Sequence, residues 1–217
     1  MRRSGILVNI SLALLLLDLV AIGIGATLPD LYLRPLILVI LCVSVLLTGR
    51  STIAILIATG LCAAAFVEVF QMLGGHLRFI ALGTAAYYLT YSAAFIVRGG
   101  PIRARGILGF GLVTLYAILM FFWLDPYGFL RLPSIVYTGV LILFIGLGLR
   151  PLLQSGPDKS AVWMAIAVVA LLISDSLRAI SIFKMPIPEL FTLAFYWVGQ
   201  FSLVRSASFF VENRNHT

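Results

Sequence analysis

Three carboxylates lie inside long apolar stretches of this sequence, and their chemistry needs an explanation. They are Asp18, Glu68 and Asp175. A charged side chain at membrane depth is costly, so it usually faces a cavity or a polar partner and marks a functional site. A carboxylic acid can donate a proton, and a carboxylate can stabilise a cation or activate water. The three residues are therefore candidates for acid–base chemistry.

Other polar side chains share helical faces with these acids. Gln71 follows Glu68 by three residues, and Arg178 follows Asp175 by three, a spacing that puts both members of each pair on one helix face. We expect these groups to meet in one pocket with an apolar slot for an acyl-type chain, because polar groups in a membrane bundle converge to satisfy one another. The candidates for substrate binding are Arg34, Gln71, Tyr91, Arg178, Tyr196 and Gln200.

Each of these residues also has a purely structural interpretation. Asp175 and Arg178 can be an intrahelical ion pair with no other role, and Glu68 can reach interfacial water near a helix end. Asp18 fits a hydrogen-bonding partner in bundle packing as well as it fits a site residue. Arg34 on its own fits a lipid-headgroup anchor.

Composition identifies the class of protein. Apolar residues make up 62% of the 217 residues, and charged residues only 11%. Mean hydropathy is +1.12, whereas soluble domains carry about 25% charged residues. We interpret residues 1–217 as one integral membrane domain. The net charge of +7 comes from scattered residues at the ends of apolar runs, which indicates membrane topology and anionic lipids rather than nucleic acid.

The apolar runs predict a bundle of about eight transmembrane helices, and the all-α membrane class follows. A span needs about 20 mostly apolar residues, and Gly, Pro and Asp clusters separate the runs. The count falls to seven if the short second or sixth run is re-entrant. The expected helices are 5–26, 31–48, 52–73, 78–97, 106–124, 132–149, 161–183 and 188–210.

The basic residues predict the orientation. With eight spans both termini share one side, which collects Arg2, Arg3, Arg50, Arg98, Arg103, Arg105, Arg150, Lys159, Arg205 and Arg214. The other side collects Arg34, Arg78, Arg131, Arg178 and Lys184. Cytoplasmic loops carry the excess of Lys and Arg, so we expect both termini in the cytoplasm. The small size and short loops favour a bacterial inner membrane.

The sequence lacks the motifs of several common classes of enzyme. The sequence has no P-loop, no HExxH and no GxSxG motif, and both histidines, His76 and His216, lie outside the expected spans. The two cysteines, Cys42 and Cys62, lie in different apolar runs and indicate neither a disulfide framework nor a metal site. We expect no metal and no cofactor.

Parts of the chain resemble a known family. Ser174-Asp175, and the Tyr196, Gly199-Gln200 and Arg205-Ser206 pattern after it, look like the last two helices of the lysoplasmalogenase (YhhN) family. Arg34-Pro35-Leu36 resembles the opening of its second helix. Val67-Glu68 stands where the family has Gly-Asp, and Tyr91 stands where it has a fourth-helix histidine. The resemblance covers most of the chain.

This resemblance implies hydrolysis of the vinyl ether bond of lysoplasmalogens, with Glu68 and Asp175 as the two acids. A proton on the β-carbon creates an oxocarbenium ion, to which water adds. Glu68 then suits the proton donor, because Arg178 favours an ionised Asp175 as cation stabiliser, and Arg34 or Arg178 suits the phosphate. The expected partners are a lysophospholipid and membrane lipids. A catalytically silent lipid-binding homologue and a small proton-coupled transporter remain alternatives, and the oligomeric state stays open.

Overall fold

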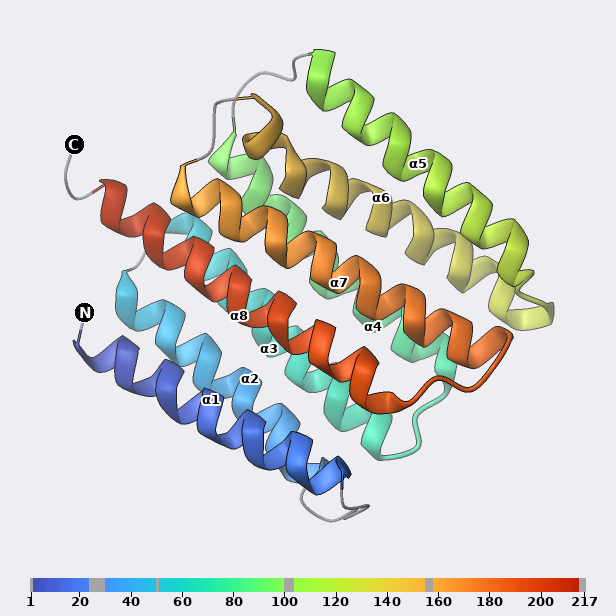
Figure 1. Ribbon diagram of the computed structural model, residues 1–217, viewed down its shortest axis with the longest axis horizontal. Helices are drawn as coiled ribbons and strands as arrows, with labels where there is room; N and C mark the ends of the chain where they lie inside the picture. Colours follow the sequence, from blue (N-terminus) through green and yellow to red (C-terminus); the bar gives the residue numbers. More distant parts are fainter. Residues whose placement is uncertain (1, 24–29, 50, 100–103, 155–157, 215–217) are drawn as a thin grey trace.

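The chain folds, in a computed structural model, into a bundle of long α-helices (Figure 1). The structure describes residues 2–23, 30–49, 51–99, 104–154 and 158–214. Within these ranges there is no β-strand, so the predicted all-α class is confirmed. The eight helices are α1 (Arg2–Gly23), α2 (Asp30–Thr48), α3 (Thr52–Met72), α4 (Leu77–Arg98), α5 (Ala104–Leu124), α6 (Arg131–Gln154), α7 (Lys159–Phe183) and α8 (Glu189–Arg214), with a 3₁₀ turn, η1 (Gly128–Leu130), before α6.

Local sequence signals explain where the helices begin and end. The side chains of Ser51 and Asp158 accept backbone N–H bonds at the starts of α3 and α7, as N-cap residues do. Gly99 closes α4 with φ 52°, a conformation that favours glycine. Two helices run several residues past their predicted ends, and one of them is α8, which continues beyond residue 210 to Arg214. The sixth helix runs on to Gln154, because Pro151 falls in its last turn, where one lost hydrogen bond is tolerated. Residues 24–26 of the first predicted span lie outside the described residues.

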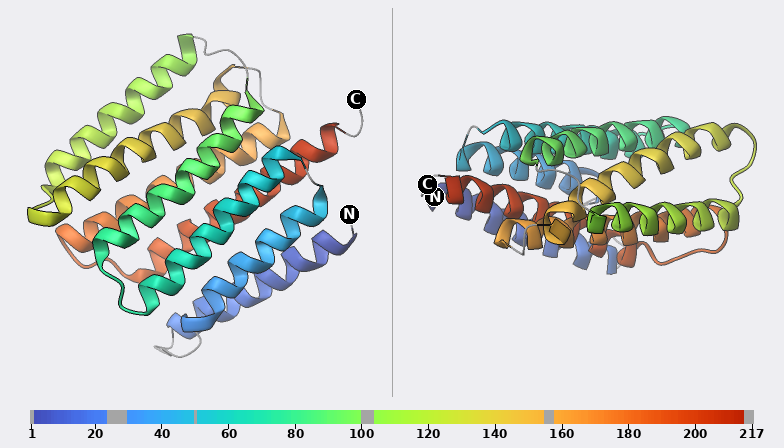
Figure 2. Two further views of the ribbon diagram at one scale, coloured as in Figure 1. Left: turned by 180° about the vertical axis from the view of Figure 1, so that it is seen from behind. Right: turned by 90° about the horizontal axis from the view of Figure 1, so that it is seen from above.

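The helices form two layers (Figure 2). One layer contains α2, α3 and α4, and the other contains α1, α8, α7 and α5. Helix α6 is tilted, and it begins beside α4 in the first layer and ends in the second. The start of α1 and the end of α8 lie at the same end of the bundle (Figure 1). Helix α5 packs along α6 and touches α7 only briefly.

The apolar character of the helices extends to the outside of the bundle. Large hydrophobic side chains such as Leu16, Phe66 and Phe122 are more than half exposed. Five helices are long and apolar enough to cross a membrane, and the described parts of α1 and α2 contain shorter apolar stretches. An outer surface of this kind suits lipid rather than water. The chain is therefore an integral membrane protein.

Small residues let the helices of the core approach closely. Gly60 of α3 lies against the ring of Tyr91 of α4, and small residues at helix contacts are typical of membrane bundles. The Sγ atoms of Cys42 and Cys62 lie 3.2 Å apart as free thiols between α2 and α3. Their positions in separate apolar runs did not predict this proximity, because it arises only from the pairing of the two helices.

Gly60→Ala should destabilise the bundle, because the added Cβ would overlap the ring of the fully buried Tyr91. We expect a loss of about 1–3 kcal/mol in the free energy of unfolding. Gly139→Ala is the matched control, because a Cβ at Gly139 meets nothing within 4 Å. Thermal unfolding in detergent measures both. Equal stability of the two variants would contradict the close α3–α4 contact.

Candidate active site

Asp175 is a carboxyl group in the interior of the bundle with hydrogen-bond partners on two other helices. It lies in the middle of the C-terminal half of α7 and is buried. The hydroxyl of Tyr88, from α4, donates a hydrogen bond to Oδ2 of Asp175. Tyr137, from α6, supplies a second side-chain hydrogen bond to the same carboxyl group. Two tyrosines from two other helices therefore fix the orientation of this carboxyl group.

Arg178 lies one turn further along α7 and links this carboxyl group to Glu68. Its Nη1 atom donates to Oε1 of Gln71, on α3, at 3.5 Å. It also interacts electrostatically with both Glu68 and Asp175. Glu68 is 3% exposed and interacts with Tyr196 as well. The structure thus brings the two acids, the arginine and the amide into one polar cluster, with a single cation shared by two carboxyl groups.

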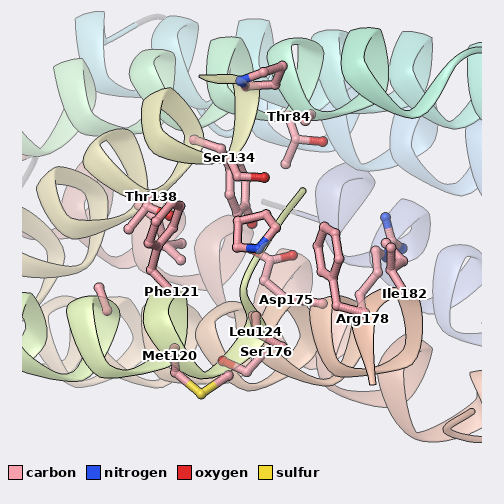
Figure 3. A pocket seen from close by; sticks show the side chains of 18 of the residues that line it. Thr84, Met120, Phe121, Leu124, Ser134, Thr138, Asp175, Ser176, Arg178 and Ile182 are labelled. Carbon is pink, nitrogen blue, oxygen red and sulfur yellow. The ribbon is translucent and has the colours of Figure 1, made fainter. Parts of the chain in front are cut away.

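A cavity of about 150 Å³ opens beside this cluster. Most of its walls come from four helices. They are the start of α4, the end of α5, the start of α6 and the end of α7. These ends meet at the end of the bundle opposite the start of α1 and the end of α8. Figure 3 shows Asp175 and Arg178 on the α7 side of this space, facing Ser134 and Thr138 of α6 and Phe121 of α5.

The lining of this cavity is amphipathic. Most of it is apolar, including Met120, Phe121 and Leu172. The polar part consists of Thr84, Tyr116, Ser134, Tyr137, Thr138, Asp175, Ser176 and Arg178. Asp175 and Arg178 thus both belong to the wall of the same small space. The carboxyl group can donate or accept a proton, and the arginine can bind an anion next to it.

Glu68 does not line the cavity. It comes from α3, and none of the lining residues belongs to that helix. We expected Glu68 and Asp175 to face one cavity, and the structure corrects that expectation, because α4 and α6 separate α3 from the space beside α5. Gln71 contacts Arg178 from the same side as Glu68 and is likewise absent from the lining.

Arg34 and Asp18 belong to a second polar cluster. Nε of Arg34 lies 3.7 Å from Oδ2 of Asp18, and Nη1 of Arg34 donates to Oε1 of Glu189 at 2.9 Å. The expectation that Arg34 joins the pocket of Arg178 is wrong, because the start of α2 packs between α1 and α8, whereas the cavity lies among α4 to α7. The sequence did not indicate Glu189 as a partner.

Tyr91, Gln200 and Tyr196 are buried outside the cavity lining. The hydroxyl of Tyr91 donates to Oε1 of Gln200 at 2.9 Å, which links α4 to α8. Tyr196 interacts electrostatically with both Glu68 and Arg178. Tyr196 therefore lies next to the polar cluster. The Tyr91–Gln200 pair lies further toward the end of the bundle that holds Arg98.

The sequence did not single out Tyr137 or Tyr88 as site residues. A tyrosine in the interior of an apolar span needs a partner for its hydroxyl. That requirement is the signal in the sequence for a buried polar group nearby. Which acid it meets depends on the packing of α4 and α6 against α7.

Comparison with known proteins agrees with this architecture. A model of the YhhN family matches residues 30–207, which is most of the chain. Neither the curated proteins nor the solved structures contain a match. The matched region begins at the first residue of α2 and ends within α8, so it includes every residue of the polar cluster and of the cavity lining.

Arg34→Gln should destabilise the protein strongly, because it removes a cation from beside the fully buried Asp18. Breaking a buried ion pair costs about 3–5 kcal/mol. Glu189→Gln is the control at the other end of the same cluster. Its side chain is 59% exposed, so we expect a loss of only about 0–1 kcal/mol. Thermal unfolding in detergent compares the two, and a larger effect of Glu189→Gln would contradict this ranking.

Proposed function

Because this chain belongs to the YhhN family, we propose that it hydrolyses the vinyl ether bond of lysoplasmalogens. The products are a fatty aldehyde and a glycerophospho-base. The observation that carries this proposal is the pairing of the Asp175 carboxyl group with Arg178 on the wall of one amphipathic cavity. An ether lipid with one chain and a phosphate needs an acid, a cation and apolar walls, and the cavity offers all three.

The reaction requires one proton and one water molecule. A carboxylic acid protonates the β-carbon of the vinyl ether, and the remaining carboxylate stabilises the oxocarbenium ion at the α-carbon. Water attacks that carbon and gives its proton to the carboxylate, which restores the acid. The hemiacetal then breaks its C–O bond to release the aldehyde and the alcohol. A single carboxyl group can perform the protonation and the activation of water in turn.

The cavity favours Asp175 for this task. The sequence suggested Glu68 as the proton donor and an ionised Asp175, but only Asp175 lies on the cavity wall. Glu68 interacts electrostatically with Arg178, so in this scheme a carboxylate at Glu68 balances the guanidinium group. Asp175 is then not needed as a counter-ion and is available to carry the proton. Glu68 is a positioning residue in this scheme.

Arg178 suits the phosphate of the substrate, because guanidinium groups bind phosphate through paired hydrogen bonds. It lies one helical turn from Asp175 toward the end of α7, where the cavity approaches the end of the bundle. A headgroup beside Arg178 would place the adjacent glycerol and vinyl ether near Asp175. Tyr88 and Tyr137 hold the carboxyl group in place through their hydrogen bonds.

Two other functions make different predictions. A catalytically silent lipid-binding homologue would bind lysophospholipid without releasing aldehyde. A transporter would move its cargo across the membrane and would expose the polar cluster to each side in turn. Release of aldehyde by the purified protein from a lysoplasmalogen, but not from its saturated alkyl ether, separates the enzyme from both.

Asp175→Asn should lower the rate of vinyl ether hydrolysis by about 10²–10⁴-fold, because an amide cannot deliver the proton. Glu68→Gln should also lose activity, since it removes the charge that balances Arg178. Glu68→Asp keeps that charge and should recover most of the rate. Aldehyde release measures turnover, and the thermal unfolding temperature checks folding. Full activity in Asp175→Asn, or equal losses in Glu68→Gln and Glu68→Asp, would refute these roles.

We further propose that the protein lies in a bacterial inner membrane with both termini in the cytoplasm. The start of α1 and the end of α8 share one end of the bundle, and that end carries the larger number of basic residues. A fluorescent protein fused after the last residue of α8 should fluoresce, and alkaline phosphatase fused there should be inactive. An active phosphatase fusion would reverse the orientation.

A further inference from the structure

The cavity is too small to enclose a lysophospholipid. A volume of about 150 Å³ is about that of a cavity known to hold benzene. A fatty chain is several times larger, and the headgroup with its glycerol also needs room. The cavity therefore accommodates the reacting end of the substrate, and the rest of the molecule must lie elsewhere.

The residues that line the cavity differ in how far they are exposed. Among the lining residues that the structure describes, only Tyr116 and Ile182 are exposed, at 38% and 43%. They belong to α5 and α7. Helix α5 is held by α6 and touches α7 only briefly, and little of its apolar stretch is buried. The boundary between α5 and α7 is therefore the side of the cavity nearest to lipid.

Tyr116 and Ser176 form a hydrogen bond across this boundary. The Tyr116 hydroxyl and Oγ of Ser176 lie 2.7 Å apart at an exposed position. Ser176 already donates its proton to the carbonyl of Leu172 at 2.7 Å, so Tyr116 is the donor to Ser176. Ser176 is the immediate neighbour of Asp175. A single neutral hydrogen bond is weak, so this contact can open without disturbing the packing of α5 on α6.

We propose that the fatty chain of the substrate stays in the bilayer and reaches Asp175 between α5 and α7, displacing the Tyr116–Ser176 hydrogen bond. This inference rests on the proposed function and adds to it the way in which the substrate is bound. The protein selects the headgroup and the vinyl ether. It does not measure the length of the chain, which lies along the exposed apolar faces of α5 and α7, such as those of Leu112 and Val169.

Chain length provides the first test. Lysoplasmalogens with one headgroup and increasing chain length are compared in mixed micelles at a fixed mole fraction, which holds the surface concentration constant. A pocket that encloses a chain discriminates by about tenfold or more per methylene, so a change in kcat/KM below about threefold across the series supports a chain in the bilayer. A steep optimum at one length would overturn the proposal.

A reversible cross-link provides the second test. In the double variant Tyr116→Cys with Ser176→Cys, a short bis-methanethiosulfonate reagent joins α5 to α7 across the proposed path, because a direct disulfide is shorter than the tyrosine side chain it would replace. The two disulfides to the reagent are reducible, so reduction opens the path again. The cross-linked form should lose at least tenfold in kcat/KM relative to the same sample after reduction. The control pair is Gly109→Cys with Leu153→Cys, treated in the same way, which joins α5 to α6, because a Cβ at Gly109 would touch Leu153. Undiminished turnover in the cross-linked Tyr116–Ser176 pair would overturn the proposal.

A third measurement needs no turnover and so separates this inference from the proposed function. A lysophospholipid with a photoreactive diazirine at the far end of its chain is bound to the wild-type protein and irradiated. Mass spectrometry should find the label on the outer faces of α5 and α7. Labelling of Leu141 or Leu172, inside the cavity, would overturn the chain placement. The outer labelling pattern without any aldehyde release would keep the chain placement and refute the enzyme.

Discussion

The structure depends on keeping one guanidinium group and two carboxyl groups within an apolar bundle. Charges at this depth are stable only when they balance one another and when their hydrogen bonds are made. Arg178 interacts with both acids, and Tyr88 and Tyr137 bond to Asp175. Tyrosine suits this task because its ring packs among apolar side chains while its hydroxyl reaches the acid. Helices α3, α4, α6 and α7 must all be in place for the cluster to exist.

The tilt of α6 accounts for the cavity beside this cluster. Because α6 begins in one layer and ends in the other (Figure 2), the helix ends around its start do not pack closely, and the cavity lies among them. Asp175 is on its wall, while Glu68 remains behind Arg178 on α3. Two acids that look alike in the sequence therefore have different environments, and of the two only Asp175 lies on the wall of the cavity.

The cluster of Asp18, Arg34 and Glu189 joins helices and lies away from the cavity. It joins α1, α2 and α8, and it contributes nothing to the cavity lining. At the opposite end of the bundle, Arg98 bonds to Asp158 and Ser160 and joins α4 to α7. Polar groups within this membrane protein thus fall into one set beside a cavity and other sets that hold helices together.

The sequence by itself determined the membrane class, the eight helices, most of their boundaries and the family, because span length, apolar content and turn residues are local properties. It also identified Glu68, Asp175, Arg178 and Gln71 as polar neighbours, since i, i+3 spacing fixes one face of a helix. Only the tertiary structure decided that Arg34 pairs with Glu189, that Tyr137 reaches Asp175, and that Asp175 rather than Glu68 meets the cavity. Those facts depend on the order and tilt of helices around one another, and helical periodicity along a single segment carries no information about its neighbours.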